Sequence, residues 1–256
     1  MTTKPLAFSV ADRTDAGRRA QNDDHLLIDN ELGLFLVLDA GGSWSEMGGR
    51  ASRVGAEVIQ RFIRERLSPE VQPRLLIESA FQVGGEALRV ETDENGWYGA
   101  SSVVLALYHS GWMYISWLGD SVAHRVSSDK IEPLTWGHTL HNLCIRQGKL
   151  TEKAIQALHG DKFRHIIGHS LGNETLPDPF EVISFAPQPG DHLILMTNGI
   201  TDTVELSELW QTCQSYSEPQ ACAKRVVELA LERGSRDNCT CVVIAFAGGD
   251  GDPPTS

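Results

Sequence analysis

The sequence lacks the features of a membrane or secreted protein. None of its apolar runs approaches the roughly 20 residues that a bilayer span needs. The opening MTTKPLAFSVADR has no long apolar core, so we expect neither a signal peptide nor an anchor. The five cysteines are odd in number and none is spaced C-x-x-C, which fits a reduced protein. We therefore expect a cytoplasmic chain.

The sequence is also poor in clustered positive charge. No basic run is longer than Arg18-Arg19, and 34 acidic residues outweigh 22 basic ones, for a formal charge of −12. This balance argues against non-specific binding to nucleic acid or to anionic membranes. We expect neither as a partner. A group of acidic metal ligands would account for part of the excess.

Five near-continuous apolar runs predict strands that are covered on both faces. The runs are GLFLVLD, SSVVLALY, WMYISWLG, DHLILMT and CTCVVIAF. The short link His109-Ser110-Gly111 joins the second run to the third, and a link of this length can only connect antiparallel neighbours.

Three amphipathic segments predict helices. The first follows Glu46, and the second follows Pro73. The third ends at Gly234. The apolar positions of the second segment are Leu76, Ala80, Val83 and Ala87, and those of the third are Val226, Val227, Ala230 and Leu231.

Together these elements predict an α+β fold, a four-layer α-β-β-α sandwich with two mainly antiparallel sheets flanked by helices. A doubly wound parallel sheet is the alternative, and it also places ligands at strand ends. The hairpin-length link argues against it. We expect one domain over residues 1–247 and a disordered tail, GGDGDPPTS, over 248–256.

The apolar runs begin or end beside a carboxylate or its amide. A single such residue is a turn former, but several beside buried strands predict oxygen ligands that meet at one sheet edge, as a hard divalent cation requires. This pattern indicates metal-assisted chemistry on an anionic substrate. The residues are Asp39, Asp120, Asn198, Asp237 and the stretch Asn22 to Asp24.

The first three candidates lie in the N-terminal part of the chain. Asp39 precedes Ala40-Gly41-Gly42, where glycines allow a ligand to approach the backbone. Asp23 and Asp24 are adjacent, so their side chains point to opposite faces of an extended chain. We expect one to reach a metal and the other to act through water or to pack elsewhere. An ordinary glycine turn and a solvated pair are the alternatives.

The other candidates have local alternatives as well. Arg19 suits phosphate, which a guanidinium grips in bidentate fashion, or it is a surface arginine. Asp120 is a metal ligand or the turn residue of a hairpin. Asp237-Asn238 supplies ligands or forms an Asx-turn. His138 and His141 could share a helix face, and a satisfied surface pair is the preferred interpretation.

At these residues the chain resembles the metal-dependent protein Ser/Thr phosphatases of type 2C, as a bacterial-type single-domain member. The resemblance covers nearly the whole length, in the motif order of the family. Its motifs are TDAGRRAQNDD, LFLVLDAGG, YGASSVVLAL, WLGDSVAHRV, the stretch LTWGHTL, RQGKLTE and HIIGHSLG, then GDHLILMTNGITD and GSRDNCTCVVIAF. One such motif is a weak indication, and all of them in order are a strong one.

The resemblance implies hydrolysis of phosphoserine and phosphothreonine in proteins by a metal-bridging water, opposing a Ser/Thr kinase in signalling. The cofactor would be Mn2+ or Mg2+, as two ions with a weaker third, and a mobile flap would span about residues 138–178. Arg19 would bind the phosphate and Asp39 would bridge two cations. The remaining implied ligands are the Ala40 carbonyl and Asp23 for the second metal, Asp237 and Asn198 for the first, and Asp120 for the third, supported by Asp24 and Asn238.

The chain departs from the family pattern at four places. Asn198 stands where an Asp is typical, and an amide brings no negative charge, so the first and third metal sites should be weakened. The loop after Asp39 is short and has no histidine. Gly137 replaces an Asp and Val122 replaces an Arg.

These departures leave two alternatives open. One is a catalytically weak or inactive relative that binds phosphoproteins as a regulator. The other is a small-molecule phosphohydrolase or nucleotide-binding domain, although no G-x-x-x-x-G-K-[ST] loop occurs.

Overall fold

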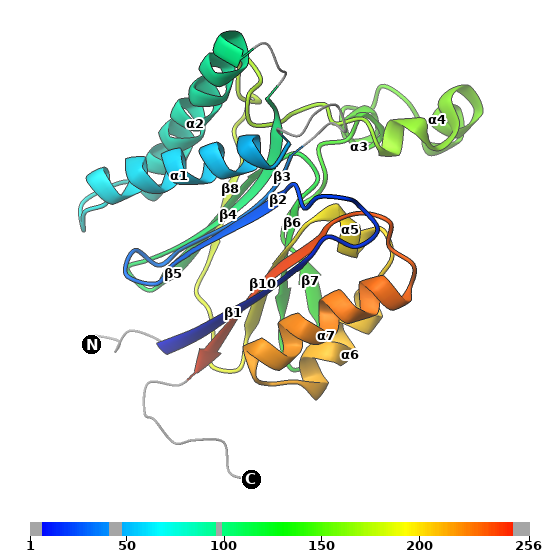
Figure 1. Cartoon of the computed structure of the whole chain (residues 1–256). Coiled ribbons are helices and arrows are strands. Elements are labelled where there is room, and N and C mark those ends of the chain that lie inside the picture. The colour runs from blue at the N-terminus through cyan, green and yellow to red at the C-terminus, as the bar shows by residue number, and fades with distance from the viewer. Residues whose placement is uncertain (1–6, 41–47, 96–98, 248–256) are drawn as a thin grey trace.

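Two five-stranded antiparallel sheets pack face to face, with helices on both outer surfaces (Figure 1). The computed structural model describes residues 7–40, 48–95 and 99–247. The first sheet has the order β1-β10-β9-β6-β7. Its strands are β1 (Ala7–Asp15), β10 (Cys239–Ala247), β9 (His192–Met196), β6 (Val122–Val126) and β7 (Ile131–Pro133). The second sheet has the order β2-β3-β4-β5-β8. Its strands are β2 (Asp24–Asp29), β3 (Leu34–Ala40), β4 (Ser101–His109), β5 (Trp112–Leu118) and β8 (Val182–Phe185).

The helices form the outer layers and one lateral extension (Figure 1). Helices α1 (Gly48–Arg66) and α2 (Pro73–Asn95) cover the second sheet, and α6 (Leu206–Ser215) and α7 (Pro219–Glu232) cover the first. The short α5 (Asn198–Thr201) follows β9. Helices α3 (Leu140–Arg146) and α4 (Glu152–His159) and the 3-10 turn η1 (Gly160–Arg164) lie to one side. The predicted α-β-β-α sandwich is confirmed.

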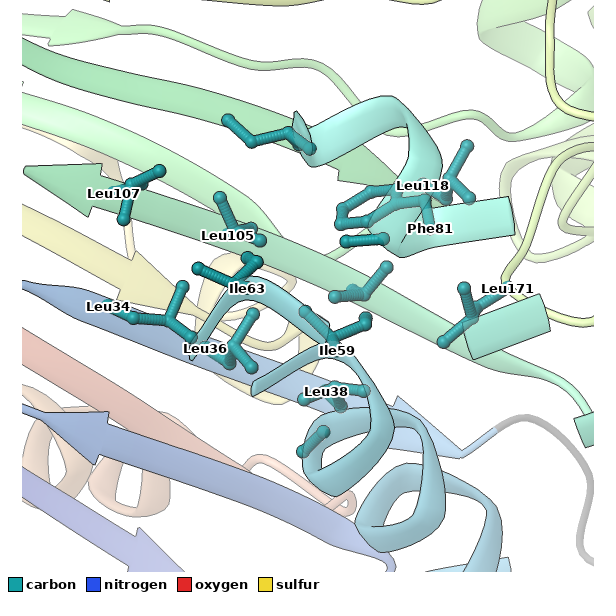
Figure 2. Packing of buried hydrophobic residues seen from close by; sticks show 14 of the residues in the cluster. Leu34, Leu36, Leu38, Ile59, Ile63, Phe81, Leu105, Leu107, Leu118 and Leu171 are labelled. Carbon is teal, nitrogen blue, oxygen red and sulfur yellow. The ribbon is translucent and has the colours of Figure 1, made fainter. Parts of the chain in front are cut away.

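Alternation along the strands divides the core into three layers. Leu34, Leu36 and Leu38 of β3 pack under α1 and α2, where Figure 2 shows them near Ile59 and Ile63. The alternate β3 residues Phe35 and Val37 pack between the two sheets. Each apolar strand is therefore buried on both faces, as its sequence predicts, because successive side chains point to opposite sides.

The antiparallel link between β4 and β5 is confirmed, with His109 opposite Trp112. Leu76 and Ala80 of the apolar face predicted for α2 are buried, whereas Val83 is 40 % exposed and Ala87 is half-buried. Ile77, Phe81 and Leu88 are buried as well. Gly84 and Gly85 complete this face, and their lack of side chains lets α2 approach its neighbours closely. A Cβ at Gly84 would lie 3.0 Å from Ile59 Cγ1.

The connection from β5 to β6 moves the chain from one sheet to the other. Gly119 makes this corner with φ +85°, and a Cβ there would lie 2.3 Å from Ser102 Cβ. Asp120 is therefore not the turn residue of a hairpin, which was one of its two predicted roles.

The predictions about secretion and tails are tested only in part. No helix in the described part of the chain is both long and apolar enough to span a membrane. All five cysteines are free thiols. The predicted disordered tail and the loop that follows Ala40 lie outside the described residues.

Candidate metal centre

Acidic side chains from both sheets meet at one end of the sandwich. Asp24 and Asp39 are direct neighbours across the β2–β3 pairing. Asn198 begins α5, and its Nδ2 donates to Asp120 Oδ2 over 3.3 Å, which joins the end of β9 to the corner after β5. Asp237 lies beside this group, because a Cβ on Gly199 would be 3.4 Å from Asp237 Cβ. The structure thus brings together the acids that the sequence places at strand ends.

Burial and mutual repulsion disfavour the charged form of these acids. Burial, followed by the charges of Asp24 and Asp120, raises the pKa of Asp39 well above its usual value. Burial also raises the pKa of Asp24 to about 7 and that of Asp120 to about 6. Removing these charges from water is costly unless a cation or donors compensate for them.

Two buried oxygen atoms at this end accept no hydrogen bond in the described structure: Asp24 Oδ1 and Asn198 Oδ1. The other oxygen of Asp24, Oδ2, accepts from the Thr197 hydroxyl at 3.0 Å. Buried oxygens are normally paired, and an exception indicates a missing partner such as an ion. Oxygen is also the donor type that Mg2+ and Mn2+ prefer. The donor set therefore fits a hard divalent cation in kind.

Asp237 already has partners for both of its oxygens. Arg19 Nε donates to Oδ1 at 3.0 Å, and Arg19 Nη2 donates to Oδ2 at 2.9 Å. The backbone N–H of Asn238 also donates to Oδ1 at 2.9 Å. Three donors leave Asp237 little capacity for a cation, and the guanidinium charge beside it opposes one, so cation binding is favoured when the arginine turns away.

Asp23 and Asn238 join three segments behind these acids. Asp23 Oδ1 accepts from the Gly49 N–H at 2.9 Å, at the start of α1. The Asp23 N–H donates to Asn238 Oδ1 at 2.9 Å, and Asn238 Nδ2 donates to the carbonyls of Ala16 and Gln21. Asn238 thus fixes the segment that carries Arg19, whereas Asp24 turns toward Thr197. The predicted division of Asp23 and Asp24 between two faces agrees with these contacts.

The backbone around Asp39 is held by β4. Ala40 is opposite Ser101 and is 9 % exposed, and the Ser101 hydroxyl donates to the Asp39 carbonyl at 3.0 Å. Within the described residues, no three His, Cys, Asp or Glu side chains stand arranged to hold an ion.

Sequence reasoning missed one acid and misplaced two histidines. Burial raises the pKa of Asp202, which follows α5 and lies close enough to Asp237 to interact with its charge. Its signal was present as the last residue of GDHLILMTNGITD.

The preferred surface interpretation of His138 and His141 is wrong. They are 2 % and 7 % exposed, because His138 packs against the rings of Trp117 and Trp136 and His141 bonds to Glu152.

Comparison with known proteins supports the resemblance. No family model matches the chain. A 2C-type protein phosphatase sequence from Streptococcus pyogenes is 25 % identical over 247 residues, which cover 93 % of this chain and 97 % of that one.

Solved structures agree with this relationship in fold. The Mycobacterium tuberculosis serine/threonine phosphatase PstP superimposes with a TM-score of 0.80 at 21 % identity, over 94 % of this chain and 99 % of that one. Its catalytic domain in complex with two manganese ions superimposes with a TM-score of 0.79 at 20 % identity, over 94 % and 99 %. The homologues and structural neighbours of this chain are therefore metal-dependent Ser/Thr phosphatases of type 2C, bacterial members among them.

Proposed function

We propose that this chain removes phosphate from phosphoserine and phosphothreonine in proteins, with divalent cations held by Asp39 near the end of β3. The observation that carries the proposal is the meeting of Asp24, Asp39 and Asp120 in a buried region, where Asp24 Oδ1 and Asn198 Oδ1 have no hydrogen-bond partner among the described residues. Its homologues are protein phosphatases. Phosphoproteins modified by a Ser/Thr kinase are the substrates that follow.

The residues that would hold two Mn2+ or Mg2+ ions come from four segments, and a fifth segment would serve a third ion. We assign Asp39 to both ions, with the Ala40 carbonyl and Asp23 serving one of them and Asp237 and Asn198 the other. Asp120 would serve a weaker third ion. Asp24 and Asn238 would support this set through the bonds described above. Bound cations would supply an activated attacking water and offset negative charge on the transferring phosphoryl group.

The chain itself would orient the substrate. Arg19 has the planar fork that binds two phosphate oxygens at once. Its side chain is 49 % exposed, so a protein substrate can reach it. Asn238 holds the Arg19 segment by bonding the carbonyls of Ala16 and Gln21 on either side of it.

We also propose that the activity is reduced. Asn198 supplies a neutral oxygen where the resemblance calls for a carboxylate, so that position attracts a cation less strongly. A chain that binds metal too weakly to hydrolyse its substrate would act as a phosphoprotein-binding regulator. The experiment below decides between these two functions.

The test is a Mn2+-dependent assay on a phosphopeptide panel, p-nitrophenyl phosphate and nucleotides, with Asp39→Asn as the control. We expect Mn2+-dependent release of phosphate from phosphopeptides, abolished in the control. Hydrolysis of nucleotides alone would instead establish a small-molecule phosphohydrolase. Binding of phosphopeptides with no release of phosphate would establish the regulator.

A further inference from the structure

A cavity of about 400 Å³ adjoins the candidate metal centre and extends beyond the residues assigned to metal ions. Asp120, Asn198 and Asp202 are among its lining residues. His141, Arg164 and His165 also line it and belong to residues 140–165, the segment containing α3, α4 and η1, which we call the cap. A group bound here would lie next to the residues proposed to handle the phosphate.

The cap differs in charge from the rest of the molecule. It carries five Lys or Arg residues and two Asp or Glu residues, in a chain whose formal net charge is −12. The basic residues are Arg146, Lys149, Lys153, Lys162 and Arg164. Of these, only Arg164 is among the residues that line the cavity. Arg164 is therefore the basic side chain that can meet an anion in the cavity, whose acidic lining residues are Asp120 and Asp202.

Contacts with Glu152 hold the Arg164 side chain in place. Its Nη2 donates to Glu152 Oε1, and the second oxygen of Glu152 bonds His141 Nε2 at 2.7 Å. His141 is 7 % exposed, so this chain of contacts is anchored in the protein interior. The Arg164 side chain is 47 % exposed, and its Nε also lies 3.6 Å from Asp161 Oδ1, so a ligand would share the guanidinium with two acids of the cap. Anchoring lowers the entropy lost when an arginine binds an anion.

The geometry points to a subsite for an acidic side chain of the substrate. We propose that the cavity takes an Asp or Glu that flanks the phosphorylated residue, that Arg164 binds its carboxylate, and that Glu152 is a positioning residue for Arg164. The proposal rests on the proposed function, which defines the phosphorylated residue. Asp120 and Asp202 also line the cavity and repel an anion, so a carboxylate there is favoured only next to Arg164.

The test compares two phosphothreonine peptides that differ only by Glu or Gln at one flanking position, with that position moved along the peptide. kcat/KM is measured with Mn2+ for the wild type, Arg164→Gln, Arg164→Lys and Glu152→Gln. Lys149→Gln is the matched control, because Lys149 is a basic cap residue that does not line the cavity. For each variant, kcat/KM for the Glu peptide is divided by kcat/KM for the Gln peptide. A loss of activity that affects both peptides equally does not change this ratio.

We expect the wild type to prefer Glu about fivefold at one position, mainly through KM, as one partly exposed ion pair allows. The ratio should fall to about one in Arg164→Gln, recover in part in Arg164→Lys, decrease in Glu152→Gln and persist in Lys149→Gln. Equal turnover of both peptides by the wild type, or a preference that survives Arg164→Gln, overturns the subsite alone. A wild type that hydrolyses neither peptide overturns the proposed function and the subsite with it.

Discussion

Arg19 and Asp237 form a bidentate ion pair, with contacts of 3.0 Å from Nε to Oδ1 and 2.9 Å from Nη2 to Oδ2. Each residue is proposed to act through its charge on a different partner, Asp237 on a cation and Arg19 on phosphate. In the ion pair, Asp237 uses acceptor sites that a cation would need, and Arg19 uses donors that phosphate would need. A cation that binds Asp237 therefore competes with the guanidinium, and a cation that displaces it frees Arg19 to bind the substrate.

This relationship predicts that Arg19→Gln tightens Mn2+ binding while it weakens hydrolysis. The side chains are 49 % and 40 % exposed, and an exposed ion pair contributes about 1 kcal/mol at most, so we expect a gain of up to about fivefold in affinity. Free Mn2+ is measured by its EPR signal during titration. Arg18→Gln, the same charge change at the exposed neighbour, is the control. Equal affinity in the two variants would show that the pair does not compete with the cation.

Much of the centre could be predicted because it depends on strand pattern. Apolar runs with acids at their ends fix Asp39 at the edge of a buried sheet, and adjacent acids in extended chain must diverge. The β5–β6 corner could not be predicted, because Gly119-Asp120-Ser121 has the composition of an ordinary hairpin turn. Whether a strand turns back or crosses to a second sheet depends on its later pairing, here of β6 with β9.

Long-range contacts account for the other misses. The sequence does not tell that Arg19 lies against Asp237, 218 positions away. It likewise hides the surroundings of His138, because Trp117 and His169 reach it from distant parts of the chain. Which residues complete the buried face of α2 depends on the segments that pack against Gly84 and Gly85. These are α1 and the segment near Gly172, and the local sequence of α2 does not reveal them.

His138 predicts an acid sensitivity of the fold. Burial, followed by the charges of His169 and Arg146, lowers its pKa to about 3, whereas an unfolded histidine titrates near 6.5. Between pH 3 and pH 6.5 the histidine is protonated in the unfolded chain and neutral in the folded chain. The contribution of neutral His138 to stability is therefore complete above about pH 6.5 and falls as the pH decreases toward 3.

His138→Phe removes that contribution and keeps a ring between Trp117 and His169. We expect the free energy of unfolding to decrease less from pH 7 to pH 4.5 in the variant than in the wild type, as measured by urea denaturation in EDTA. His109→Phe, in the β4–β5 hairpin, is the control and should keep the wild-type slope. Parallel slopes for wild type and His138→Phe would contradict the prediction.

Asn198→Asp is expected to strengthen the metal centre and weaken the metal-free fold. The amide donates to Asp120 Oδ2 at 3.3 Å, so an aspartate there loses a hydrogen bond and places two carboxylates together, which should cost about 1–3 kcal/mol without metal. A cation reverses this, and we expect Mn2+ affinity to increase about tenfold, the effect of about 1.4 kcal/mol, with faster hydrolysis of phosphopeptides. Melting in EDTA and in Mn2+ measures both effects, and Asn30→Asp, in the exposed turn after β2, is the charge-matched control. If the two variants bind Mn2+ equally and turn over at one rate, position 198 does not contribute to the metal centre.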